Sequence, residues 1–132
     1  MTEADIQKRL GRYYRNIAPP YTIAYELKIV KGKSFAFKQL ADHQLTSLLM
    51  AENGLHYKIK DMSAANGYSD KKPFDAIYIK AKVSLVILCF WKPRTLKRCV
   101  LIPAKEYVLL RELHPRKSIR LEELSEFEYI DL

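Results

Sequence analysis

The hydrophobic positions in the N-terminal part of the chain change from a helical repeat to a strand repeat. Apolar residues recur every three or four positions from Thr2 to about Ile17, which predicts a helix that Pro19-Pro20 ends. From residue 21 to residue 30 the apolar residues alternate with others, which predicts a strand with one face in the core. The two repeats consist of Ile6, Leu10, Tyr13, Tyr14 and Ile17 for the helix and of Ile23, Tyr25, Leu27 and Ile29 for the strand.

The middle of the chain predicts a second helix and then a pair of strands. An apolar stripe from about Phe37 to Asn53 indicates the helix, and Gly54 is a typical residue for its C-terminal cap. Residues 55–60 alternate between apolar and polar, which predicts a half-buried strand, and residues 74–80 predict its neighbour beyond a polar loop. We therefore expect an inserted hairpin at about residues 55–82.

The C-terminal half contains the most hydrophobic segment. The run from Val83 to Trp91 is continuously apolar, which predicts a central strand that is covered on both faces. A short strand at 98–102, a helix from Pro103 to about Leu113 and a short acidic helix or helical turn at 118–127 complete the prediction. Strands that alternate with helices predict an α/β fold, with helices packed on a mixed sheet, and 132 residues suffice for one domain.

Charge is distributed unevenly along the chain. The net charge is +8, but the acidic segment 121–132 contains five of the fifteen acidic residues and no basic one. Residues 1–120 therefore carry 23 basic against 10 acidic residues. A body this basic attracts polyanions, with nucleic acid as the first expectation and an anionic membrane surface as the second. The acidic residues of the segment are Glu122, Glu123, Glu126, Glu128 and Asp131.

The cysteines and the apolar runs predict a cytoplasmic protein without a membrane partner. Cys89 and Cys99 lie in apolar segments without metal-ligand spacing, as buried free thiols do in a reducing compartment. No apolar leader follows Met1. The longest apolar run, residues 83–91, is too short to cross a bilayer as a helix.

The candidate chemistry lies on the strand at 21–30. Glu26 and Lys28 are two positions apart, so both side chains project from the face opposite the core. A carboxylate can hold a hard divalent cation, and a neighbouring lysine can stabilise a hydroxide or the charge that develops on a phosphate. The same pair is also typical of a solvated strand face, where it would do no chemistry.

A longer series of residues around this pair resembles a known family. The motif Glu26-Leu27-Lys28 is followed by a basic turn with Ser34-Phe35 and by a helix that carries His43-Gln44. This series, together with the apolar strand at 83–91 and the strand after it, resembles the RecU-type Holliday-junction resolvases of the PD-(D/E)XK nuclease superfamily. The resemblance covers about residues 22–53 and 83–110.

The resemblance implies a restriction-endonuclease-like core and a DNA endonuclease that depends on Mg²⁺ or Mn²⁺. Glu26 would match the carboxylate ligand of the metal, together with the Leu27 carbonyl, and Lys28 the catalytic lysine. Gln44 would match the glutamine that lies near the active site. It further implies branched DNA as a substrate in recombination or repair, a possible homodimer, and a phage-like or prophage-like origin.

The sequence departs from the family at the second metal-binding aspartate. The family usually has this residue on the preceding strand, but residues 19–22 contain no acidic side chain. Asp75, in Lys72-Pro73-Phe74-Asp75, looks like the displaced Pro-Asp element, so we expect it to share the metal with Glu26. Asp61 is a second candidate, and Glu3 is a candidate acidic residue on the first helix. The alternative is that Asp75 is an ordinary turn aspartate.

Two further hypotheses for the function remain open beside the nuclease. A nuclease-fold protein that binds nucleic acid without cutting it would explain the missing upstream aspartate. A toxin, antitoxin or regulator that shares only the α/β layout would bind DNA without the steep salt dependence of a phosphate-binding protein. The basic residues expected to contact phosphates are Lys8, Arg12, Lys31, Lys33, Lys58, Lys71 and Lys72.

Overall fold

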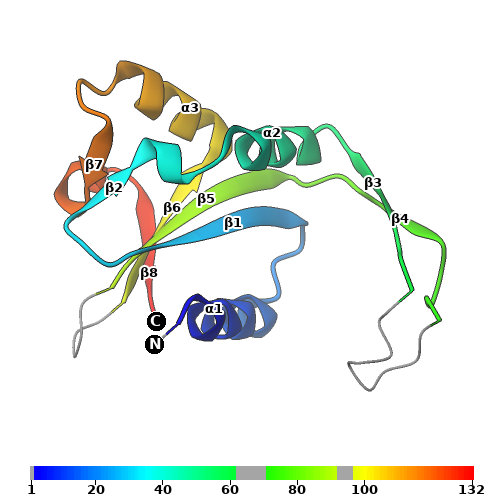
Figure 1. Ribbon diagram of the computed structural model, residues 1–132. Coiled ribbons are helices and arrows are strands. Elements are labelled where there is room, and N and C mark those ends of the chain that lie inside the picture. Colours follow the sequence, from blue (N-terminus) through cyan, green and yellow to red (C-terminus); the bar gives the residue numbers. More distant parts are fainter. Residues whose placement is uncertain (1, 62–70, 92–96) are drawn as a thin grey trace.

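A mixed four-stranded sheet organises the molecule (Figure 1). The computed structural model describes residues 2–61, 71–91 and 97–132. The first two strands of the sheet are parallel and the other neighbours are antiparallel. In order across the sheet, the strands are β1 (Ile23–Val30), β5 (Val83–Phe90), β6 (Arg98–Pro103) and β8 (Glu128–Asp131).

Helices cover both faces of this sheet. Figure 1 shows α1 (Glu3–Ile17) below the sheet and α2 (Asp42–Ala51) and α3 (Ala104–Leu113) above it. The lower layer buries Ile6 and Leu10 of α1 against one face, and the upper layer buries leucines of α2 and Tyr107 of α3 against the other. The described chain is therefore a mixed α+β fold with flanking helices, as the hydrophobic pattern predicts.

The central strand is the best-predicted element. β5 lies between β1 and β6, and seven of its eight residues are buried. Successive side chains point to opposite faces, so Val86 and Leu88 contact the upper layer while Ile87 and Cys89 contact the lower one. Cys89 and its register partner Cys99 are buried free thiols, as predicted.

The first helix also agrees with its prediction. Thr2 is its N-cap, and the side chains and backbone of Thr2 and Asp5 form a reciprocal capping box. The hydrogen bonds from Thr2 hold the pKa of the Asp5 carboxyl below its usual value. The second helix is shorter than predicted, because Phe37–Gln39 forms a 3-10 turn, η1, and α2 begins only at Asp42. Phe37 and Leu40 are buried there, so core packing decides the local backbone.

The inserted hairpin differs from its prediction in burial. β3 (Leu55–Lys58) pairs antiparallel with β4 (Ala76–Ile79), but the two strands form a separate ribbon and do not join the main sheet. Figure 1 shows this ribbon leaving the body where β5 begins. The strand predicted at 55–60 is present over residues 55–58, and its polar residues His56 and Lys58 are exposed as expected. Its apolar side is covered only in part, because Tyr57 is 49% exposed. We call the described residues 55–61 and 71–80 the arm.

The C-terminal segment differs most from its prediction. Of the short acidic helix or helical turn predicted at 118–127, the structure has only a short 3-10 turn, η3 (Leu121–Leu124), and a strand that was not predicted, β7 (Ser118–Arg120), precedes it. β7 pairs with β2 (Ser34–Ala36), and β8 closes the main sheet. These strands of three or four residues are too short to show a hydrophobic repeat, which explains why the sequence does not reveal them. No helix among the described residues has both the length and the apolar character needed to cross a bilayer.

Candidate functional site

The two faces of β1 have different surroundings, and this difference creates the candidate site. Leu27 is 3% exposed and packs with α1 on the lower face. Glu26 and Lys28 project from the other face, toward the layer that contains α2. Because β1 is an edge strand with a neighbour on one side only, this polar face stays accessible to solvent along the edge.

Glu26, Lys28 and Gln44 converge on this face. The Gln44 Nε2 amide donates a hydrogen bond to Glu26 Oε1 at 2.9 Å. The Lys28 Nζ ammonium lies 3.6 Å from the same oxygen. The side chains of Lys28 and Glu26 are 23% and 33% exposed, so the group is partly shielded and still open to a ligand. The structure therefore brings these three candidate residues together.

The amide of Gln44 is held in one orientation. Its Oε1 accepts the backbone N–H of Ala41 at 3.1 Å, which leaves the NH₂ group to face Glu26. Gln44 thus caps the N-terminus of α2 and positions the carboxylate at the same time. The sequence signal for this role is the His43-Gln44 motif on the helix.

The body holds this helix firmly over the strand. Leu45 and Leu48 of α2 are buried in the upper core. The buried hydroxyl of Ser84 on β5 donates a 2.6 Å hydrogen bond to the Leu48 carbonyl. Since β5 also pairs with β1 along its whole length, Glu26 and Gln44 are fixed to the same rigid support.

A polar hollow lies at the end of β1. It has a volume of about 410 Å³ and is lined by residues of α1, β1 and the following turn. Glu3 and Lys31, both singled out in the sequence, line it. Ser34 of the basic turn and Gln39 also line it, and the sequence assigns neither of them a role. Glu26, Lys28 and Gln44 are not among the residues that line this hollow.

The structure does not bring Asp75 to Glu26. Asp75 directly precedes β4, in the part of the arm away from the sheet, and its side chain is 95% exposed. Its carboxylate pairs with Lys72 at 3.4 Å. Asp61, the second candidate, accepts the backbone N–H of Lys72 at 2.9 Å. Both aspartates serve the arm itself, because the two strands of the arm pair with each other and carry these residues away from the sheet.

The predicted phosphate contacts fall into two groups. Lys8 and Arg12 are exposed on α1, and Lys31 and Lys33 are exposed in the turn after β1. These four residues belong to the body. The other three lie exposed on the arm, and these are Lys58, Lys71 and Lys72.

The carboxylate oxygens of Glu26 are the type of ligand that a hard cation prefers. Mg²⁺ is usually held by one or two carboxylates together with waters and substrate phosphates, so Glu26 can serve as such an anchor. Among residues 2–61, 71–91 and 97–132, no cluster of three or more His, Cys, Asp or Glu side chains could form a metal cage. Glu26 would therefore hold an ion together with a bound phosphate, and not alone.

Comparison with known proteins leaves this geometry as the basis for a function. The chain matches no protein-family model, no curated protein and no solved structure.

Proposed function

We propose that the protein is a metal-dependent DNA endonuclease that acts on branched or otherwise structured DNA. The proposal rests on one observation, which is that a lysine and a glutamine both face the same oxygen of one partly shielded carboxylate. A glutamine that only filled space would not require a fixed amide. Its double role as helix cap and carboxylate partner supports a positioned ligand.

Each residue of the group has a distinct task in this proposal. Glu26 anchors Mg²⁺ or Mn²⁺, with the Leu27 carbonyl on the same strand as an additional ligand. A bound ion of this kind lowers the pKa of its water and offsets charge on the phosphate. Lys28 orients the attacking water or stabilises the developing negative charge, and Gln44 keeps the carboxylate in place.

The distribution of charge supports DNA as the substrate. Lys31 and Lys33 lie in the turn directly after the strand that carries Glu26. Lys8 and Arg12 add positive charge on the neighbouring helix. Such contacts bind phosphates without reading bases, so the shape of the DNA would have to provide selectivity.

The test measures nicking of a labelled four-way junction and of a matched duplex, with Mg²⁺, with Mn²⁺ and with EDTA. The wild-type chain should cut only with metal, and Glu26→Gln and Lys28→Met should each lower the rate by at least about a hundredfold. Gln44→Leu should have a smaller effect, about ten- to a hundredfold, because it acts through Glu26. Glu112→Gln changes an exposed carboxylate on α3 and serves as the control.

A second candidate is a nuclease-fold protein that binds branched DNA without cutting it. The position of Asp75 on the arm favours it, since the site then has one carboxylate where the related enzymes have more. Junction binding in EDTA that matches binding with metal, together with no nicking at any metal concentration, would establish this candidate and exclude the nuclease.

A further inference from the structure

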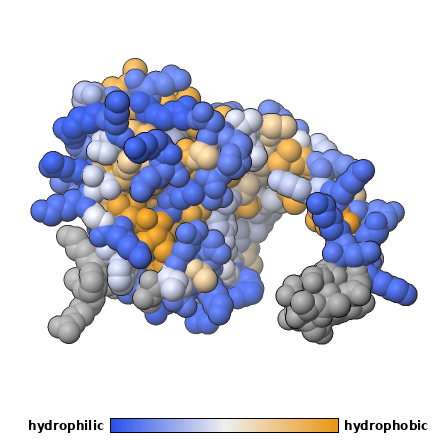
Figure 2. All heavy atoms as spheres, viewed as in Figure 1, coloured by the Kyte–Doolittle hydropathy of each residue, from blue (hydrophilic) through white to orange (hydrophobic). Residues whose placement is uncertain are grey.

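The arm exposes more apolar surface than its size would suggest. Four of the ten large hydrophobic side chains exposed among the described residues lie on it. By the strand register, Tyr57 and Ile77 share one face of the ribbon, and Tyr78 lies on the other. These side chains are 49%, 40% and 65% exposed, and Phe74 beside them is 51% exposed. Figure 2 shows apolar residues on the arm among hydrophilic ones, clear of the body.

The arm is also basic. Its described residues include five lysines and two aspartates, and one lysine–aspartate pair, Lys72 with Asp75, is internal. Lys58 at the end of β3, Lys60 just beyond it, and Lys80 near the foot of the arm, where the arm joins the body, are exposed. A segment that combines exposed aromatic rings with lysines fits a partner surface that is apolar in its floor and acidic at its rim.

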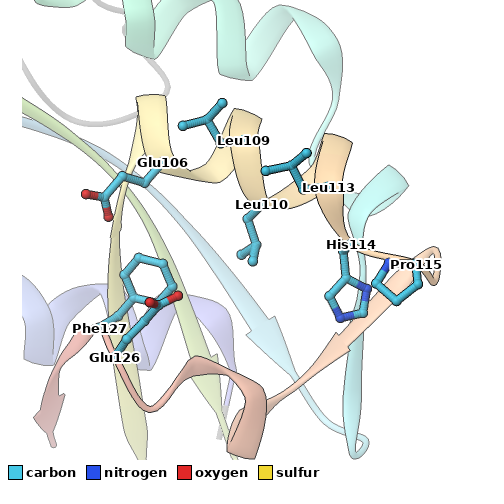
Figure 3. Close-up of a pocket in the computed structure, with 8 residues that line it drawn as sticks. All are labelled: Glu106, Leu109, Leu110, Leu113, His114, Pro115, Glu126 and Phe127. Carbon is cyan, nitrogen blue, oxygen red and sulfur yellow. The ribbon is translucent and has the colours of Figure 1, made fainter.

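The molecule contains a surface of this description on α3. A hollow lies between α3 and the segment that carries Phe127 (Figure 3), and its volume is about 530 Å³. Leucines from α3 form one wall and the Phe127 ring lies across from them. Two of these leucines, Leu109 and Leu113, are 56% and 80% exposed. The carboxylates of Glu106 and Glu126 stand at its edge (Figure 3).

A second hollow continues this one toward the foot of the arm. It has a volume of about 630 Å³ and shares Glu106, Glu126 and Phe127 with the first. Glu128 adds a third carboxylate, and Lys82 lines the hollow beside the arm. The Lys82 ammonium lies 5.9 Å from the centre of the Tyr21 ring, so this surface already holds one lysine over an aromatic ring. We call the two joined hollows the acidic groove.

The arm cannot fold back onto the acidic groove of its own chain without breaking the backbone hydrogen bonds at its foot. Ala81 is 3% exposed, and its N–H donates to the Ala51 carbonyl at 2.8 Å. The next N–H, that of Lys82, donates to the Thr22 carbonyl at 2.9 Å. These bonds fix the direction in which the arm leaves the body, and Figure 1 shows that it leads away.

We propose that the acidic groove receives the arm of a second copy of this chain, in a reciprocal dimer. The groove begins at the foot of the arm, so a two-fold axis close to Lys82 would lay each arm along the groove of the other copy. The exposed aromatic side chains of the arm would then cover Leu109 and Leu113. The lysines of the arm would meet Glu106, Glu126 and Glu128. This inference does not depend on the nuclease proposal.

Charge reversal provides a sharp test with the full-length chain. Light scattering over a range of concentrations should show a dimer for the wild type, and added salt should weaken it. The arm variant Lys58→Glu/Lys60→Glu and the groove variant Glu106→Lys/Glu126→Lys should each dimerise about tenfold or more weakly, because like charges then face each other. An equimolar mixture of the two variants should dimerise again, since each reversed arm meets a reversed groove.

The control is Glu112→Lys/Glu122→Lys, which changes net charge by the same amount at two exposed carboxylates outside the groove. It should dimerise like the wild type. Circular dichroism should show that every variant is folded. A wild-type monomer at all concentrations, a dimer that both reversals leave intact, or a mixture that stays monomeric would each overturn the proposal.

Discussion

β4 and β5 have similar residues, but their positions in the molecule give them different degrees of burial. β4 and β5 are separated by only three residues, and both consist largely of apolar and β-branched or aromatic side chains. β5 has a strand on each side and a helical layer on each face, so nearly all of it is buried. β4 has one partner, β3, and two of its four residues are exposed.

This difference in burial indicates different roles, since β5 stabilises the fold whereas the arm is available to bind a partner. A buried strand contributes to folding through the apolar area that it removes from water. A lone two-stranded ribbon is marginally stable in water, so the arm contributes little to folding of the body. Exposed apolar residues kept on such a ribbon are better explained by a partner than by the fold.

The largest expected effect follows from truncating matched residues in the two regions. Leu88 on β5 is fully buried, so Leu88→Ala should lower the free energy of unfolding by about 2–5 kcal/mol. Ile77→Ala on β4 should lower it by less than about 1 kcal/mol, because that side chain is 40% exposed. Urea denaturation at a concentration where the chain is monomeric measures both. Equal losses would mean that the arm is part of the folding core.

The next largest effect on stability is expected at Gly54, where the arm joins the body. Gly54 has φ +112°, and an added Cβ would collide with the Tyr78 ring. Gly54→Ala should therefore cost about 1–3 kcal/mol. Adding Tyr78→Ala should relieve the collision but not the backbone strain. Gly11, with open space around it in α1, is the matched control, and Gly11→Ala should stabilise the chain by up to about 1 kcal/mol in the same urea titration. A Gly54→Ala chain as stable as the wild type would contradict this account.

A single hydroxyl in the upper core gives a smaller effect. Tyr107 is fully buried, its hydroxyl donates to the Phe37 carbonyl at 3.2 Å, and burial raises its pKa to about 12. Tyr107→Phe should cost about 1 kcal/mol, because the ring stays while the carbonyl loses its donor. The control Tyr129→Phe alters a ring that is 54% exposed and should change thermal stability little. A loss of equal size in both variants would show that the buried hydrogen bond is not the cause.

The same contrast explains which parts of the fold were predictable. The strand at 83–90 and the first helix carry long, regular patterns, so the sequence identifies them. The short strands β2, β7 and β8 depend on distant pairing partners that no local pattern reveals. The alternation at 55–60 correctly indicates a strand, but it cannot show that the apolar face meets no core.

The candidate site likewise has a part that local geometry predicts and a part that depends on tertiary contacts. Glu26 and Lys28 share a face because strand geometry requires it, and the motif on the helix placed Gln44 beside them. The meeting of Asp75 with Glu26 was inferred from a resemblance, across a segment whose direction only tertiary contacts decide. Those contacts, at Ala81 and Lys82, send the arm away from the sheet.

The smallest expected effect lies at the edge of the body, where Asp131 of β8 faces Arg98 of β6. Hydrogen bonds from Arg98 Nε at 3.0 Å and Nη2 at 3.2 Å hold the pKa of the Asp131 carboxyl below its usual value. A lowered pKa in the folded state adds stability above the unfolded pKa, and this stability is lost as the pH falls through the folded value. Thermal unfolding of the wild type should therefore weaken more between about pH 5 and pH 2 than that of Asp131→Asn. Glu122→Gln controls for the change in charge, and parallel pH profiles for the wild type and Asp131→Asn would show that the pair does not hold the edge strand.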